Sequence, residues 1–167
     1  MSDFEDFTVV DADYLARSHM NEAAIAALRA AEVEGIRIGA SALDDRLVLI
    51  GLMAGDTNLA AQAVRQLGET PERIRFAARA LVQTPPFGDE AQLPPDTKLP
   101  VTEEVRHLCR LAVDETRRLG QRSVGPEHLL LAMTRDDEQS AAQLLKSAGL
   151  TLERVRRALH TILGFPE

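Results

Sequence analysis

The sequence predicts an all-α fold in which two four-helix repeats pack as one pseudo-twofold domain of eight helices. Residues 21–82 align with residues 102–163 at a constant offset of 81 and without a gap, and identical residues recur throughout the alignment. Apolar positions in the two copies follow helical spacing, and no stretch shows the alternation of a half-buried strand. One repeat alone would bury only a marginal core, so the two copies are expected to share one.

The composition divides the chain into segments. We expect an acidic N-terminal segment at residues 1–17, a first repeat at 18–82, a connector at 83–101 and a second repeat at 102–164, with 18–164 forming one structural domain. The connector holds five of the eight prolines, so it is not helical throughout and is expected to be an ordered or semi-rigid link.

Capping residues mark the helix ends of the first repeat. The first helix is expected to start after Asp11 or Ser18, which are both capable N-caps, and to end before Gly39. Asp56 is expected to cap the third helix. Thr70 is expected to cap the fourth, because a proline suited to the first helical position follows it.

The second repeat carries the same signals 81 residues later. Thr102 precedes two glutamates and is expected to cap the first helix, which should end before Gly120. Pro126 fits the first position of the second helix, where its missing N–H costs nothing. Asp137 and Thr151 are expected to cap the third and fourth helices.

Composition and charge argue against several classes of protein. The formal net charge of −7 does not suit a general nucleic-acid binder, because phosphate neutralisation needs a basic surface. No apolar run is long enough to span a membrane, and the acidic N-terminus is unlike a signal peptide. The single cysteine, Cys109, cannot form an internal disulfide. We therefore expect a cytoplasmic protein that contacts neither nucleic acid nor membrane.

The sequence predicts neither catalysis nor a cofactor. It contains no G-x-x-x-x-G-K-[ST] loop, so a phosphate cradle of that kind is absent. His128 has no ligand-type neighbour at metal-binding spacing, so a packed or hydrogen-bonded histidine is expected and no metal site. Cys109 aligns with Leu28 and is expected to be a buried small hydrophobe. No nucleophile–base pair is apparent, and we expect no enzyme activity.

The run RLGQRSVGPEHLLLAM, followed by AAQLLKSAGLTLERVR, resembles the N-terminal repeat of the Clp chaperone ATPases, especially the ClpC branch. The resemblance covers about residues 20–164 and includes the duplication. It implies a compact, non-catalytic eight-helix module that receives substrates and adaptor proteins for an attached ATPase ring. Because the phosphate loop is absent, the chain is expected to be a free-standing version of this module.

The same resemblance implies a ligand site. In the ClpC branch the glutamate of the Glu-His pair helps to bind phosphorylated arginine, its carboxylate facing the guanidinium. Glu127 occupies that position here; the alternative is that it only complements its helix dipole. The first repeat has Arg46 instead, which would repel a guanidinium, so at most one such site is expected. The candidate ligand-binding residues are Val101, Thr102, Gly125, Pro126 and Glu127.

The acidic N-terminal segment contains Phe4, Phe7 and Tyr14, which are three of the six aromatic residues. Exposed aromatic side chains generally dock onto another surface, so these are candidate partner-binding residues. They are expected either to cover a groove of the domain itself or to form a short motif for a partner.

The leading functional expectation is a binding protein in Clp-dependent proteolysis that captures substrates, adaptors or peptide-like ligands. Sequestration of cyclic peptide antibiotics that target Clp proteins is a variant of this role. The alternative is a regulatory protein–protein interaction module that is unrelated to proteolysis.

Overall fold

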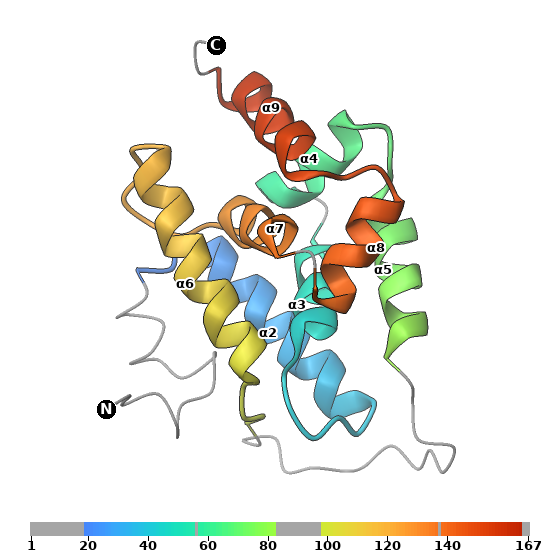
Figure 1. The fold of residues 1–167 in the computed structure, drawn as a ribbon. Helices are drawn as coiled ribbons and strands as arrows, with labels where there is room; N and C mark the ends of the chain where they lie inside the picture. The colour runs from blue at the N-terminus through green and yellow to red at the C-terminus, as the bar shows by residue number, and fades with distance from the viewer. Residues whose placement is uncertain (1–18, 56, 83–97, 137, 165–167) are drawn as a thin grey trace.

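The computed structural model describes residues 19–55, 57–82, 98–136 and 138–164. Across these ranges the chain forms eight α-helices and no β-strand, so the predicted all-α fold is confirmed (Figure 1). The first repeat supplies α2 (Glu22–Arg37), α3 (Asp45–Leu52), α4 (Leu59–Gln66) and α5 (Pro71–Leu81). The second supplies α6 (Glu103–Arg118), α7 (Pro126–Arg135), α8 (Ser140–Ser147) and α9 (Leu152–Leu163).

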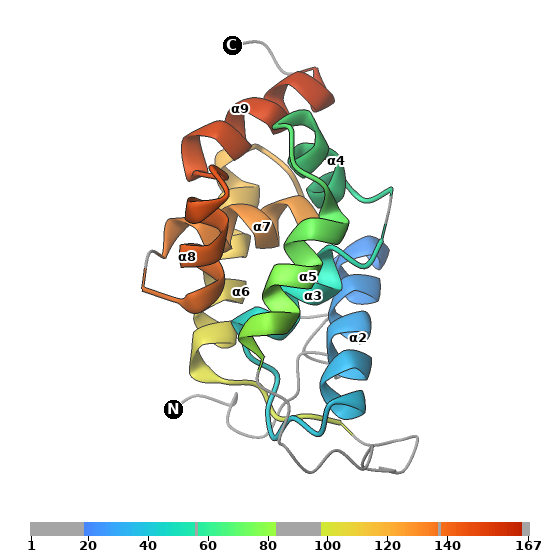
Figure 2. The same cartoon turned by 90° about the vertical axis from the view of Figure 1, so that its right-hand side faces the viewer.

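The short helices α3 and α7 lie at the centre of the molecule (Figure 1). Each contains a nearly continuous apolar run, and each is buried along almost its whole length. α2 packs on α3, and α6 packs on α7. Across the repeats, α4 packs on α9 at one end of the molecule, and α5 packs on α8 (Figure 2).

Backbone hydrogen bonds join the repeats in a reciprocal way. The Asn21 N–H donates to the carbonyl of Val124 at 2.9 Å, and 81 residues later the Thr102 N–H donates to the carbonyl of Leu43 at 3.1 Å. Each bond links the start of the first helix in one repeat to the loop before the second helix of the other. We call these two junctions the α2–α7 junction and the α6–α3 junction. Because the two junctions correspond, the two repeats have the predicted pseudo-twofold relation.

The start of α2 differs from the prediction. Its N-cap is Asn21, whose Oδ1 accepts the Ala24 N–H at 2.9 Å. Residues 19 and 20 form extended backbone contacts with the loop at Val124, and that pairing is incompatible with a helix there. Both predicted caps, Asp11 and Ser18, lie outside the described residues.

Several local signals are confirmed. Thr70, Thr102 and Thr151 cap their helices, each hydroxyl accepting the N–H three residues on, at 3.2, 3.3 and 3.4 Å. Gly39 and Gly120 follow the ends of α2 and α6 with φ of 74° and 67°, the left-handed conformation that glycine tolerates best.

Two caps were predicted wrongly. α4 begins after Asn58, whose Oδ1 accepts the Ala61 N–H at 2.8 Å, instead of after Asp56. α8 begins after Gln139, which makes no side-chain cap bond of its own, instead of after Asp137. Both aspartates lie two residues too early for this bond, and both are outside the described residues.

Ion pairs between a buried glutamate and a partly exposed arginine join the first helix of each repeat to the fourth. Glu115 of α6 is 1% exposed and lies 2.9 Å from Arg156 of α9 and 3.2 Å from Arg135 of α7. In the first repeat, Glu34 of α2 lies 2.8 Å from Arg79 of α5. Such pairs favour this helix arrangement because the buried glutamate charge would be costly without its partner.

Candidate functional site

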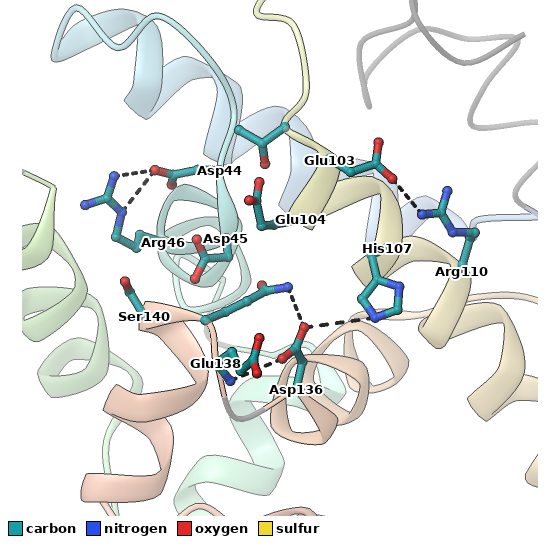
Figure 3. A pocket seen from close by; sticks show the side chains of 12 residues that line it. Asp44, Asp45, Arg46, Glu103, Glu104, His107, Arg110, Asp136, Glu138 and Ser140 are labelled. Atoms are coloured by element: carbon teal, nitrogen blue, oxygen red, sulfur yellow. Dashed lines mark hydrogen bonds and ion pairs between the residues drawn. The ribbon is translucent and has the colours of Figure 1, made fainter. Parts of the chain in front are cut away.

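A groove opens where the N-terminal ends of α3, α6 and α8 converge (Figure 3). It has two adjoining parts. The acidic compartment, of about 770 Å³, is lined by six carboxylate side chains, those of Asp44, Asp45, Glu103, Glu104, Asp136 and Glu138. The second part, of about 570 Å³, lies between the 38–42 loop and the end of α5 and has a mixed lining of aliphatic and polar side chains. We call it the apolar compartment after its aliphatic side chains, which the acidic compartment lacks. The groove therefore includes the α6–α3 junction and draws on both repeats.

The start of α3 fixes one wall of the acidic compartment. Asp44 is the N-cap, and its Oδ1 accepts the Leu47 N–H at 3.0 Å. Its Oδ2 accepts from the Nε of Arg46 at 3.0 Å, and the Nη1 of Arg46 donates to the carbonyl of Leu81 at 2.8 Å. The Asp44 carboxylate raises the pKa of Arg46. Arg46 thus holds the start of α3 against the end of α5, where the exposed carbonyls of a helix favour a cation.

Asp45 connects the two repeats. It is 7% exposed, and its Oδ2 accepts the Ala141 N–H of α8 at 2.8 Å. This bond supplies the side-chain cap that α8 lacks within its own repeat. Burial raises the pKa of Asp45, while the bond from Ala141 opposes that shift.

The first turn of α6 forms the opposite wall. Glu103 lies 2.8 Å from Arg110 and 3.3 Å from Arg106. The hydrogen bond from Arg110 is the main reason that the pKa of Glu103 is lowered. Glu104 and His107 face the acidic compartment from the same helix (Figure 3).

The loop between α7 and α8 closes the acidic compartment. Asp136 Oδ2 lies 4.0 Å from His107 Nε2 and accepts from Gln139 Nε2 at 3.0 Å. Asp136 Oδ1 accepts the Glu138 N–H at 3.1 Å. These contacts keep the Asp136 carboxylate at the groove, as Figure 3 shows.

The structure divides the five predicted ligand residues between the two junctions. Thr102 lines both compartments of the groove, and Val101, which is buried, pairs with Leu43 beside it. Gly125, Pro126 and Glu127 instead begin α7, directly after the residue that pairs with Met20 at the α2–α7 junction. The predicted residues therefore lie at two different junctions, and their role in ligand binding stays a prediction. Phe4, Phe7 and Tyr14 lie outside the described residues.

Glu127 and His128 face the interior. Glu127 is 4% exposed and His128 is fully buried. The Gly125 N–H donates to His128 Nδ1 at 2.8 Å, which confirms that His128 is packed and hydrogen-bonded. Glu127 Oε1 lies 3.2 Å from the same nitrogen and would lie 2.2 Å from a Cβ at position 125. A side chain at position 125 would therefore displace this carboxylate. The role of Glu127 as a ligand-binding residue stays a prediction.

The pKa values of this pair follow from burial. Desolvation raises the pKa of Glu127 and lowers that of His128 to about 4. His128 is thus neutral at physiological pH and acts as an internal capping acceptor for α7. Its Nε2 has no hydrogen-bond partner within the described part of the chain.

Sequence reasoning missed most residues of the groove. Asp45, Asp136 and Glu138 were not among the predicted site residues. A usable signal was present in the alignment, because Asp45 and Arg46 replace the proline and glutamate of the other repeat. In the structure these two charged residues have partners of their own: Asp45 contacts α8 and Arg46 contacts the end of α5.

The groove is suited to holding a ligand by hydrogen bonds and charge. Within the described ranges, no group of three or more His, Cys, Asp or Glu side chains is arranged to hold a metal ion. Among the same residues, no helix is both long and apolar enough to cross a membrane.

Comparison with known sequences gives the family. The Clp repeat (R) N-terminal domain matches residues 19–148 and 100–165. The chain is 30% identical over 140 residues to the negative regulator of genetic competence ClpC/MecB of Bacillus subtilis, covering 84% of this chain and 16% of that protein. The same figures apply to the chaperone protein ClpB of Oceanobacillus iheyensis. The chain therefore spans only a small part of the length of these relatives.

Solved structures agree with the fold. The N-terminal domain of ClpD from Arabidopsis thaliana has a TM-score of 0.64 at 22% identity, covering 87% of this chain and 95% of that one. The Hsp104 N-terminal domain from Candida albicans has a TM-score of 0.67 at 19% identity, covering 89% and 93%. Together with the sequence match, these observations show that the chain belongs to the Clp repeat (R) N-terminal domain family.

Proposed function

We propose that this chain is a non-catalytic binding module that captures protein or peptide segments, as substrates or adaptors of a Clp-type system, in the groove between α3, α6 and α8. One observation carries the proposal: within a domain of this family, the groove is built from both repeats and is large enough for several side chains. Its cytoplasmic location and its sequestration of cyclic peptides stay predictions.

The contacts among the polar groups of the groove favour a binding role over a catalytic one. Asp44 and Arg46 hold each other, Asp45 caps α8, and Glu103 is paired with Arg110. These contacts pre-organise the walls, and a pre-organised surface pays less conformational entropy when a ligand docks.

Binding can be tested with a permanently unfolded protein, reduced and carboxymethylated α-lactalbumin, labelled with a fluorophore and followed by anisotropy. The variant Ala42→Trp/Glu104→Lys fills the apolar compartment and reverses a charge in the acidic one. We expect it to bind at least about tenfold more weakly than wild type. Glu153→Lys is the matched control, because Glu153 occupies the same first-turn position in α9, away from the groove.

Two results would overturn the proposal: no measurable binding by the wild type, or equal binding by the wild type and the groove variant. A regulatory role outside proteolysis would show itself differently. In that case the groove variant would lose its cellular partner, while turnover of Clp substrates would not change.

A further inference from the structure

We propose that the groove selects an extended peptide segment carrying an apolar side chain and, nearby, an unphosphorylated basic side chain, the first seated in the apolar compartment and the second in the acidic one. This inference rests on the proposed function and gives it a ligand class. It follows from four features of the groove.

The first feature is continuity. Asp44, Arg46 and Thr102 line both compartments, so the two form one groove with a common boundary. Thr102 and Leu43 are held there by backbone pairing between the repeats. A ligand long enough to span the boundary therefore meets an apolar and an acidic environment in succession.

The second feature is the apolar compartment. Polar side chains line part of it, but its aliphatic lining residues are Ile38, Ala40, Ala42, Leu47, Leu81 and Val82. Leu81 is 36% exposed and is among the few large hydrophobic side chains left open to solvent in the described ranges. An aliphatic side chain of a ligand would cover it and gain the free energy of apolar burial.

The third feature is the charge of the acidic compartment. Six carboxylates face two arginines, and both arginines already have carboxylate partners, Arg46 with Asp44 and Arg110 with Glu103. The unbalanced negative charge, to which Glu104 and Glu138 contribute, attracts a cation and repels a phosphate.

The fourth feature is independent of charge. Gln139, at the floor of the acidic compartment, is 9% exposed, and within the described part its Oε1 has no hydrogen-bond partner. Its Nε2 is held by Asp136, so the amide oxygen is fixed as an acceptor. A buried acceptor without a donor is costly, and the N–H groups of a guanidinium or ammonium would satisfy it.

The test uses the full chain and labelled twelve-residue peptides of neutral background that contain one leucine and one arginine, separated by one to six residues. Fluorescence polarisation measures binding at each spacing. At the best spacing, three further peptides replace arginine by citrulline, arginine by phosphoarginine, or leucine by serine. We expect each replacement to weaken binding about tenfold. Citrulline and serine each remove one charge-assisted or apolar contact, and the phosphate of phosphoarginine is repelled by the carboxylates.

Protein variants assign the effect to the groove. Glu104→Gln and Glu138→Gln are expected to reduce the preference for arginine over citrulline about fivefold each, through loss of one carboxylate. Glu153→Gln is the control and should keep the full preference. Thermal unfolding confirms that each variant is folded.

The outcomes separate this inference from the proposed function. If unfolded protein binds in the groove but citrulline binds as well as arginine, the groove binds peptides without this selectivity and the inference fails alone. Tighter binding of phosphoarginine than of arginine would also overturn it. If no unfolded protein binds, the proposed function fails as well.

Discussion

The starts of α3 and α7 are equivalent positions in the two repeats, yet their polar side chains make different contacts. At α7 the polar groups turn inward: His128 caps its own helix, and Glu127 lies buried against Gly125. At α3 they reach outward, Asp45 to α8 and Arg46 to α5. The repeat that resembles the family most closely thus turns these groups inward, whereas the start of α3 in the diverged repeat forms one wall of the groove. Resemblance alone is a poor guide to the exposed site.

We expect the largest difference between the repeats at Gly51, where α3 packs very closely on α2. A Cβ on Gly51 of α3 would lie 2.1 Å from the carbonyl oxygen of Ala27 in α2, whereas the equivalent position in α7 is Ala132. We expect Gly51→Ala to destabilise the protein by at least about 3 kcal/mol, because backbone must move. Ala132→Gly should cost about 1 kcal/mol, mainly through helix propensity. Urea unfolding checks both, and similar losses would remove this difference between the repeats.

The titration of His128 has no equivalent in the first repeat, which has Leu47 at this position. The pKa of His128 falls from 6.5 to about 4 on folding, so its contribution to stability is complete above pH 6.5 and is lost as the pH falls towards 4. The loss should reach roughly 3 kcal/mol.

His128→Leu gives α7 the residue of α3 and removes this dependence. We expect the free energy of unfolding of the wild type to fall relative to that of the variant as the pH is lowered from 6.5 to 4, measured by urea unfolding at each pH. A constant difference over that range would mean that His128 does not titrate on unfolding.

The bond from Asp45 to α8 joins the repeats, and α7 has a proline at the equivalent position. Asp45→Ala should lower the free energy of unfolding by about 1–2 kcal/mol, the usual value of an N-cap. Asp45→Asn keeps an acceptor oxygen and should lose less. If the two variants lose equally, the bond to Ala141 is not what stabilises α8.

The smallest effect is expected at Glu127. Because its carboxylate is buried and does not line the groove, Glu127→Gln should change the affinity for the leucine–arginine peptide less than about twofold. Titration calorimetry with that peptide and with its phosphoarginine form checks this. A tenfold loss in either titration would restore the sequence-based assignment of Glu127 as the ligand carboxylate.

The same residue gives a pH test. The pKa of Glu127 is raised above 4.5 in the fold, so the folded state is stabilised by protonation and loses stability as the pH rises from about 4.5 through the folded pKa. Glu127→Gln, which stays neutral, should therefore be more stable than wild type at pH 7. This advantage should disappear below pH 4.5.

Local signals could be read from the sequence, and contacts between distant segments could not. The caps at Thr70, Thr102 and Thr151 depend on residues three positions away, and all three were predicted. The bond from Asp45 to Ala141 joins residues 96 positions apart, so no local pattern reveals it.

The candidate site illustrates the same limit. Thr102 was predicted to bind a ligand and lines the groove, but its neighbours there come from α3 and from the loop after α7. Gly125 to Glu127 were grouped with it because of their resemblance to a family motif. The crossed pairing of the repeats places them at the other junction, and spacing along the chain cannot show that crossing.

The reciprocal junctions have a consequence for the origin of the fold. Each repeat gives the other the same contact that it receives, which is the arrangement of an isologous twofold dimer written into one polypeptide. An ancestral single repeat would have needed a second copy of itself to complete its backbone pairing. Within one polypeptide the two halves need not be identical, so one half can carry charges that the other lacks.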